Sequence, residues 1–141
     1  MKISIPTRLV SILTILILLT QLFFVALIAW PIDVIELKSL EILSNQKIYA
    51  GDVVWYKLKY NKKKDLPCSV SKQIVNKIIV TFPAEFSHMP IGNREMIQSV
   101  QIPKFIEPGM HKFRGSMTYR INFLREKTYT VESPEFMVHE R

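Results

Sequence analysis

Residues 9–30 read "LVSILTILILLTQLFFVALIAW" and contain no charged side chain. Fifteen of these 22 residues are Leu, Ile, Val or Phe. As a helix the segment would extend for roughly 33 Å, which matches the hydrocarbon core of a bilayer at about 30 Å. A helix that is apolar on every side would need a larger soluble body around it than the rest of this 141-residue chain supplies. The sequence therefore predicts a transmembrane helix over residues 9–30.

A cleavable signal peptide is the alternative interpretation of this segment. Signal peptides have an apolar core of about 7–15 residues and small residues before the cleavage site. Here the apolar run is longer, and cleavage after Ala29 would leave the bulky Leu27 where a small side chain is required. Trp30 suits the headgroup region, and Pro31 ends a helix. We expect an uncleaved signal-anchor, with a secreted domain as the alternative.

The charged residues that flank the segment indicate its orientation. Lys2 and Arg8 precede it, whereas Asp33 and Glu36 follow soon after it. Because Lys and Arg are retained in the cytoplasm, residues 1–8 are predicted to form a cytoplasmic tail. We expect a single-pass protein of the cytoplasmic (inner) membrane, with its N-terminus inside and its C-terminal domain in the periplasm or outside the cell.

Residues 110–123 carry apolar side chains at alternate positions. Phe113 and Tyr119 hold odd positions, while Lys, Arg, Ser, Thr and Asn hold the even ones. This period is typical of a half-buried strand. A turn at "LRE" and the returning "KTYTV" predict a hairpin. The change of phase at Pro134 predicts a bulge that directs Phe136 into the core.

Other strand-like segments precede this hairpin. "IELKSLEIL" is broken at Lys38-Ser39, and "NKIIVTFP" and "MIQSVQIPKF" are bounded by prolines. "DVVWYKLKY" alternates cleanly, with the inward series Val54, Tyr56, Leu58 and Tyr60. About seven strands and no helical period predict a mainly β chain with an antiparallel β-sandwich over residues 47–141. Residues 31–46 would supply a linker and the first strand.

The sequence offers no set of residues for catalysis or metal binding. Its one cysteine, Cys68, excludes an intramolecular disulfide, and we expect it to be a small, partly buried hydrophobe. His88, His111 and His139 lack the spacing of metal ligands and are expected at the surface or at the rim of the core. No Ser/His/Asp set, phosphate-binding loop or carboxylate pair stands out. We therefore expect a protein that is not an enzyme, with no catalytic, cofactor-binding or metal-binding residues.

Two long stretches carry a resemblance to known proteins. They are "IYAGDVVWYKLKYNKKKDLPCSVSKQIVNKIIVTFP" and "IEPGMHKFRGSMTYRINFLREKTYTVESPEFMV". Together they resemble small membrane-anchored proteins of tailed bacteriophages and prophages, which are mostly of uncharacterised function. The resemblance implies an Ig-like or fibronectin-like sandwich after the helix. It also implies a role on the host envelope, in lysis or in superinfection exclusion, and it transfers no catalytic residues.

The chain carries a net charge of +7, which permits an anionic partner without requiring one. Alternation directs five basic side chains outward, and we predict that they form one basic face for anionic lipid, envelope polymer or an acidic protein: Lys57, Lys59, Lys112, Arg114 and Arg120. The alternative is a solvated surface. "KKKD" at residues 62–65 is expected to be a solvated loop. Nucleic acid is not expected as a partner, because the domain lies outside the cell and lacks interleaved exposed aromatics.

The segment "EFSHMPIGNRE" is expected to be the longest loop and a contact region for a protein partner. Its predicted contact residues are His88, Met89, Ile91 and Arg94. We thus expect a non-enzymatic, single-pass membrane protein that displays an Ig-like binding domain, possessing no cofactor. The alternative is a structural subunit of an envelope or virion complex, and the oligomeric state stays open.

Overall fold

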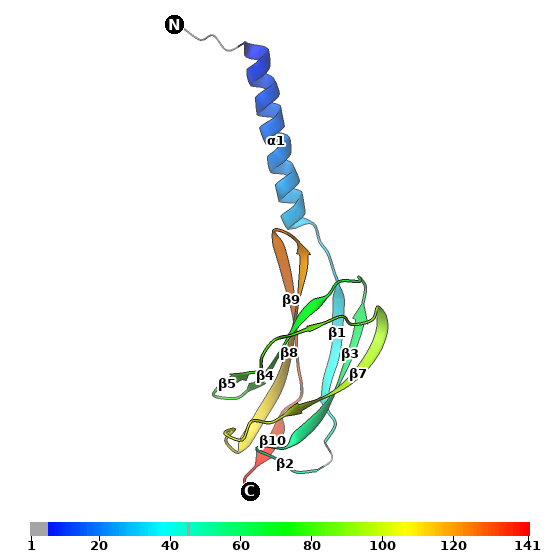
Figure 1. The fold of residues 1–141 in the computed structure, drawn as a ribbon, viewed down its shortest axis with the longest axis vertical. Coiled ribbons are helices and arrows are strands. Elements are labelled where there is room, and N and C mark those ends of the chain that lie inside the picture. The colour runs from blue at the N-terminus through cyan, green and yellow to red at the C-terminus, as the bar shows by residue number, and fades with distance from the viewer. Residues whose placement is uncertain (1–5, 45) are drawn as a thin grey trace. The chain divides into compact units, whose positions relative to one another are not determined.

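The computed structural model describes residues 6–44 and 46–141, and it divides the chain into two compact units. One unit joins the N-terminal segment as far as Ile32 to residues 121–125, and the other contains the remainder, from Asp33 onward. Helix α1 (Thr7–Ala29) is the helix next to the N-terminus in Figure 1. It ends where the Trp30 N–H donates to the Ala26 carbonyl and Pro31 follows. The predicted helix over residues 9–30 is therefore confirmed, and it is long and apolar enough to cross a membrane.

The described residues form ten strands, and together with the helix they confirm a mainly β chain. The strands are β1 (Ile35–Ile42), β2 (Ile48–Tyr49), β3 (Val53–Lys62), β4 (Cys68–Val75), β5 (Ile79–Thr81), β6 (Glu85–Ser87), β7 (Gly92–Gln101), β8 (Gly109–Asn122), β9 (Arg125–Glu132) and β10 (Phe136–His139). The additional strands beyond the predicted seven are short, with two or three residues each in β2, β5 and β6.

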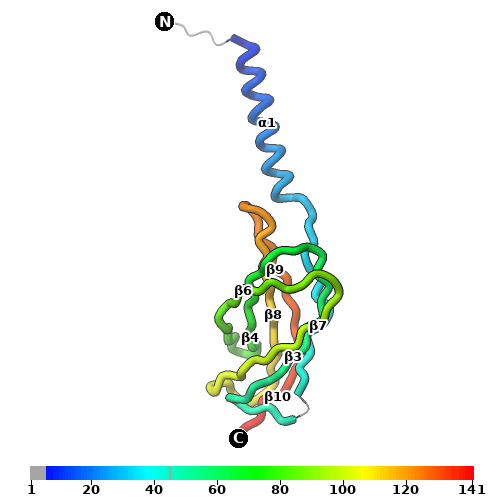
Figure 2. The backbone as a smooth tube through the Cα atoms, turned by 45° about the vertical axis from the view of Figure 1, so that its right-hand side comes forward, coloured from blue at the N-terminus to red at the C-terminus, as the bar shows by residue number. Residues whose placement is uncertain are grey.

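The strands form two sheets. Figure 1 shows the strands as a ribbon, and Figure 2 shows the same backbone as a tube after a turn of 45°. The smaller sheet has the order β1-β3-β7, and the larger has the order β2-β10-β8-β4-β5, with β6 paired to β4 and β9 paired to β8. Among the described residues, neighbouring strands pair antiparallel apart from β10 with β2, which is parallel. Strand β1 pairs with β3 along most of its length, so it belongs to the sandwich rather than to a linker. Its register shifts between Leu37 and Ser39, which confirms the predicted break.

The core lies between these sheets and follows the period-two pattern. Tyr56 and Tyr60 of β3 and Phe113 and Tyr119 of β8 are buried, whereas their immediate neighbours in each strand, which point the other way, are more exposed. The rings of Tyr56 and Phe113 meet with centroids 4.9 Å apart. Since alternation directs these side chains to one side of each strand, it also decides which sheet faces meet.

The predicted change of phase near Pro134 is present, but it separates two strands, β9 and β10, instead of forming a bulge within one strand. Both pair with β8, and the chain leaves the ladder between them. Ser133 covers the break, because its N–H donates to the Phe113 carbonyl and its hydroxyl oxygen accepts from the Phe113 N–H at 3.0 Å. Phe136 is then buried, as predicted. These bonds keep the backbone of the long strand satisfied where its partner strand is interrupted.

The sequence interpretation was wrong for the segment before β7. "NKIIVTFP" was expected to be a full strand, but it holds the turn of a hairpin and the short β5. The missing strand is β4, which pairs with β8 over eight residues, from Cys68 opposite Tyr119 to Val75 opposite Lys112. Its inward series is interrupted by Lys72, so the alternation is difficult to recognise.

Candidate functional site

The five residues of the predicted basic face do not share a face. Lys57 and Lys59 lie on β3 in the smaller sheet, whereas Lys112, Arg114 and Arg120 lie on β8 in the larger one. Because the inward side chains of β3 and β8 meet in the core, the outward side chains of the two strands point in opposite directions. The alternation was assigned correctly, but placing both strands in one sheet was wrong.

Each of these five cations also has a carboxylate partner. The pairs are Lys57–Glu41 (3.5 Å), Lys59–Glu95 (3.5 Å), Lys112–Glu135 (3.8 Å), Arg114–Glu132 (2.6 Å) and Arg120–Glu126 (3.5 Å). Such exposed pairs contribute about 0–1 kcal/mol each to stability. Their main effect here is to offset the positive charge locally, so neither sheet presents a concentrated cationic surface through these residues.

The predicted contact loop is shorter and less exposed than expected. Its first and last parts belong to β6 and β7, and Arg94 lies exposed on β7. Met89 is only 2% exposed, so its assignment to an exposed patch was wrong. His88 is exposed and lies 2.6 Å from the Asp65 carboxylate, while Ile91 remains exposed. The structure therefore does not gather these four residues into one docking surface.

Lys62 explains why Met89 is held inward. It is buried, and its ammonium group donates to the carbonyls of Leu66 (2.8 Å) and Met89 (2.7 Å). The same nitrogen lies 5.8 Å from the centroid of the Tyr119 ring. The "KKKD" segment was expected to be a solvated loop, which is wrong for its first lysine. Lys62 continues the inward even-numbered series of β3, and this is the signal that the sequence contained.

Cys68 and Tyr119 lie in the same buried region. Burial raises the pKa of the Cys68 thiol, and the thiol donates to the Ser87 carbonyl at 3.5 Å. Burial also raises the pKa of Tyr119, and the neighbouring Cys68 adds to this shift. Both groups are thus held neutral, and a neutral thiol is a poor nucleophile. The arrangement suits a structural core, as predicted for Cys68.

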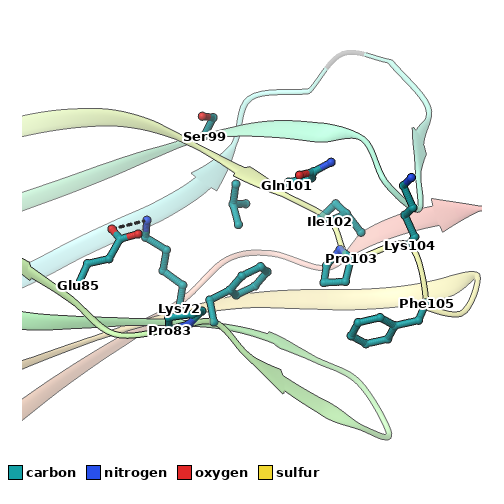
Figure 3. A pocket seen from close by; sticks show the side chains of 11 residues that line it. Lys72, Pro83, Glu85, Ser99, Gln101, Ile102, Pro103, Lys104 and Phe105 are labelled. Carbon is teal, nitrogen blue, oxygen red and sulfur yellow. Dashed lines mark hydrogen bonds and ion pairs between the residues drawn. The ribbon is translucent and has the colours of Figure 1, made fainter.

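A cleft of about 590 Å³ opens beside the end of β7 (Figure 3). One wall contains Lys72 and Glu85, which form an ion pair at 3.3 Å, and another contains Ser99 and Gln101 of β7. Phe105 lies at its rim. Cleft side chains of this kind can make hydrogen bonds and apolar contacts, and sequence reasoning did not identify the cleft because its walls come from strands distant in sequence.

The histidines and acidic residues are dispersed over the described residues. In that part of the chain no three His, Cys, Asp or Glu side chains lie close enough to hold a metal ion. His111 was expected at the surface, but it is buried, with its Nε2 2.9 Å from the Glu107 carbonyl. This correction follows from position, since residue 111 belongs to the inward odd-numbered series of β8.

Comparison with known proteins adds no assignment to this geometry. No protein-family model matches the sequence, and no curated protein is significantly similar to it. The resemblance to membrane-anchored phage proteins stays a prediction.

Proposed function

We propose that this chain is a non-enzymatic, single-pass membrane protein that displays its β-sandwich outside the cytoplasm. One observation carries the proposal: over its 23 residues, helix α1 buries none of its side chains within the chain. Fifteen large apolar side chains left in water would oppose solubility, since burial of each is worth about 1.5–3 kcal/mol. A lipid bilayer is the surrounding that removes this cost.

The sandwich supports the same proposal because it closes a core from its own strands. Its buried side chains come from β1, β2, β3, β4, β7, β8 and β10 and from the connections, and α1 contributes none. The exposed apolar surface of α1 therefore favours a lipid environment, whereas the sandwich can fold in water. We propose an N-in orientation with a periplasmic or extracellular Ig-like domain, on the basis of Lys2 and Arg8 before the segment.

Binding is a better role for the domain than catalysis. The Cys68 thiol, which could act as a nucleophile only if it were ionised and accessible, is buried and neutral. The cleft beside β7 presents groups suited to non-covalent contact. The resemblance to phage proteins favours a partner in the host envelope.

Membrane fractionation combined with intact-mass measurement tests this function. The full chain expressed in bacteria should remain in the membrane after alkaline carbonate washing, and protease added to spheroplasts should digest the sandwich. Its mass should include residues 9–30. Recovery of a soluble form that lacks about the first 29 residues would instead establish the secreted alternative. Protection of the sandwich from protease would contradict the orientation.

A further inference from the structure

The turn between β8 and β9 exposes two large apolar side chains. Phe123 is 73% exposed and Leu124 is 45% exposed. The Asn122 side-chain oxygen accepts the Leu124 N–H at 2.9 Å, which closes the turn and leaves both apolar side chains at its apex. A polar turn would be the ordinary choice for a solvated hairpin, so this apex requires an explanation.

Two hydrogen bonds join this turn to the C-terminal end of α1. The Asn122 amide donates to the Leu27 carbonyl at 2.9 Å, and the Arg125 guanidinium donates to the Trp30 carbonyl. The last carbonyls of a helix have no partners within the helix, and a cation beside them is favoured by the helix dipole. The turn thus supplies donors to the helix end from about 95 residues further along the chain.

These contacts place the turn and the end of α1 at one level within the same compact unit. Trp30, at that level, is 66% exposed. Aromatic rings prefer the interface between hydrocarbon and headgroups, where an apolar body and polar backbone can both be accommodated. A turn with unsatisfied backbone groups would not enter the hydrocarbon itself.

We propose that the β8–β9 turn is a second membrane-contacting element, which inserts Phe123 and Leu124 into the interfacial layer of the bilayer beside the end of α1. This proposal rests on the proposed transmembrane role of α1. The turn would contact lipid rather than a protein partner, because it is hydrogen-bonded to the end of α1 that would emerge from the bilayer. Arg125 would remain at the depth of the lipid phosphates.

Depth-dependent fluorescence quenching tests the proposal in the full chain reconstituted into phosphatidylcholine vesicles. Trp30→Phe and Trp55→Phe remove both native tryptophans, and Phe123→Trp then supplies the reporter. Phe105→Trp in the same background is the matched control, since Phe105 is also 73% exposed but lies in the connection at the other end of β8. Lipids with a quencher near the headgroup report contact with the interface.

We expect the Phe123→Trp reporter to lose about half of its emission or more and to show a blue-shifted spectrum, as interfacial insertion predicts. The Phe105→Trp reporter should lose little. Equal quenching of the two reporters would overturn the proposal. The Trp55→Phe chain keeps Trp30 and reports on the helix end separately. If Trp30 is quenched but a tryptophan at position 123 is not, only the membrane contact of the turn is overturned. If neither tryptophan is quenched, the membrane anchor is overturned as well.

Discussion

Helix α1 and strand β8 are both rich in large apolar residues, but they dispose of them in opposite ways. No side chain of α1 is buried over its 23 residues, whereas β8 buries Phe113, Met117 and Tyr119 on one side. The other side of β8 carries Lys, Arg, Ser and Thr. Apolar content is therefore not what brings a segment into the chain's own core. A period that separates apolar from polar side chains does so, and a segment without such a period needs an apolar solvent.

Truncation of Tyr119 should give the largest effect and would test the β8 side of this comparison. Tyr119 is fully buried, and Tyr119→Ala should lower the free energy of unfolding by about 3–5 kcal/mol, as aromatic truncations in cores do. Thr118→Ala changes the outward neighbour, whose hydroxyl meets that of Thr128, and should cost less than about 1 kcal/mol. Urea denaturation of the detergent-solubilised chain measures both. Equal losses would contradict the alternation.

A charge placed in α1 tests the other side of the comparison. Leu18→Arg should disfavour membrane insertion by about 2.5–3.5 kcal/mol plus the lost leucine contribution. The free energy of unfolding of the sandwich should stay unchanged, because Leu18 is exposed on α1 and contributes nothing to the core. The fraction of chain retained in washed membranes and the urea midpoint give the two readouts. A shifted midpoint with normal retention would show that α1 belongs to the protein core.

Lys62 sharpens the comparison, since it is a cation on the inward side of a core strand. Lys62→Met keeps the length of the side chain but leaves the Leu66 and Met89 carbonyls without this donor, and should cost about 1–3 kcal/mol of stability. Lys59→Met on the outward side removes only an exposed ion pair and should cost less than about 1 kcal/mol. Denaturation curves for the two variants are directly comparable. A stabilised Lys62→Met variant would mean that the buried cation opposes folding.

The smallest effect is expected at Asp33, the first residue of the sandwich unit. The hydrogen bond from Lys127, reinforced by its charge, lowers the pKa of the Asp33 carboxyl below 3.8. A pKa that is depressed in the folded state contributes stability above the unfolded value, and this is lost as the pH falls through the folded value. Stability should therefore decline slightly less below about pH 4 in Asp33→Asn than in the native chain. NMR titration of the carboxyl checks the direction, and a raised pKa would contradict it.

Local patterns predicted the parts of this fold that depend on one segment at a time. The long apolar run without charged residues predicted α1. The strict alternation in β3 and β8 predicted two core strands and their inward residues. Strand β4 was not predicted because Lys72 interrupts its inward series of apolar residues. Lys72 is tolerated at that position because it lies at the cleft and forms an ion pair with Glu85. Assigning β3 and β8 to one sheet failed for a different reason, since alternation specifies which side of a strand is inward and not which strand lies beside it.

The position of β10 has a consequence for how the chain is made. This last strand in chain order lies between β2 and β8, so the short β2 can pair with β10 in the sheet only when residues 136–139 are present. Synthesis delivers the N-terminal strands first, and until β10 has been made the backbone groups of β2 and the adjacent edge of β8 lack this pairing. Closure of the larger sheet therefore waits for β10. Until then the emerging domain presents an open sheet edge, which is a surface that can pair with other chains.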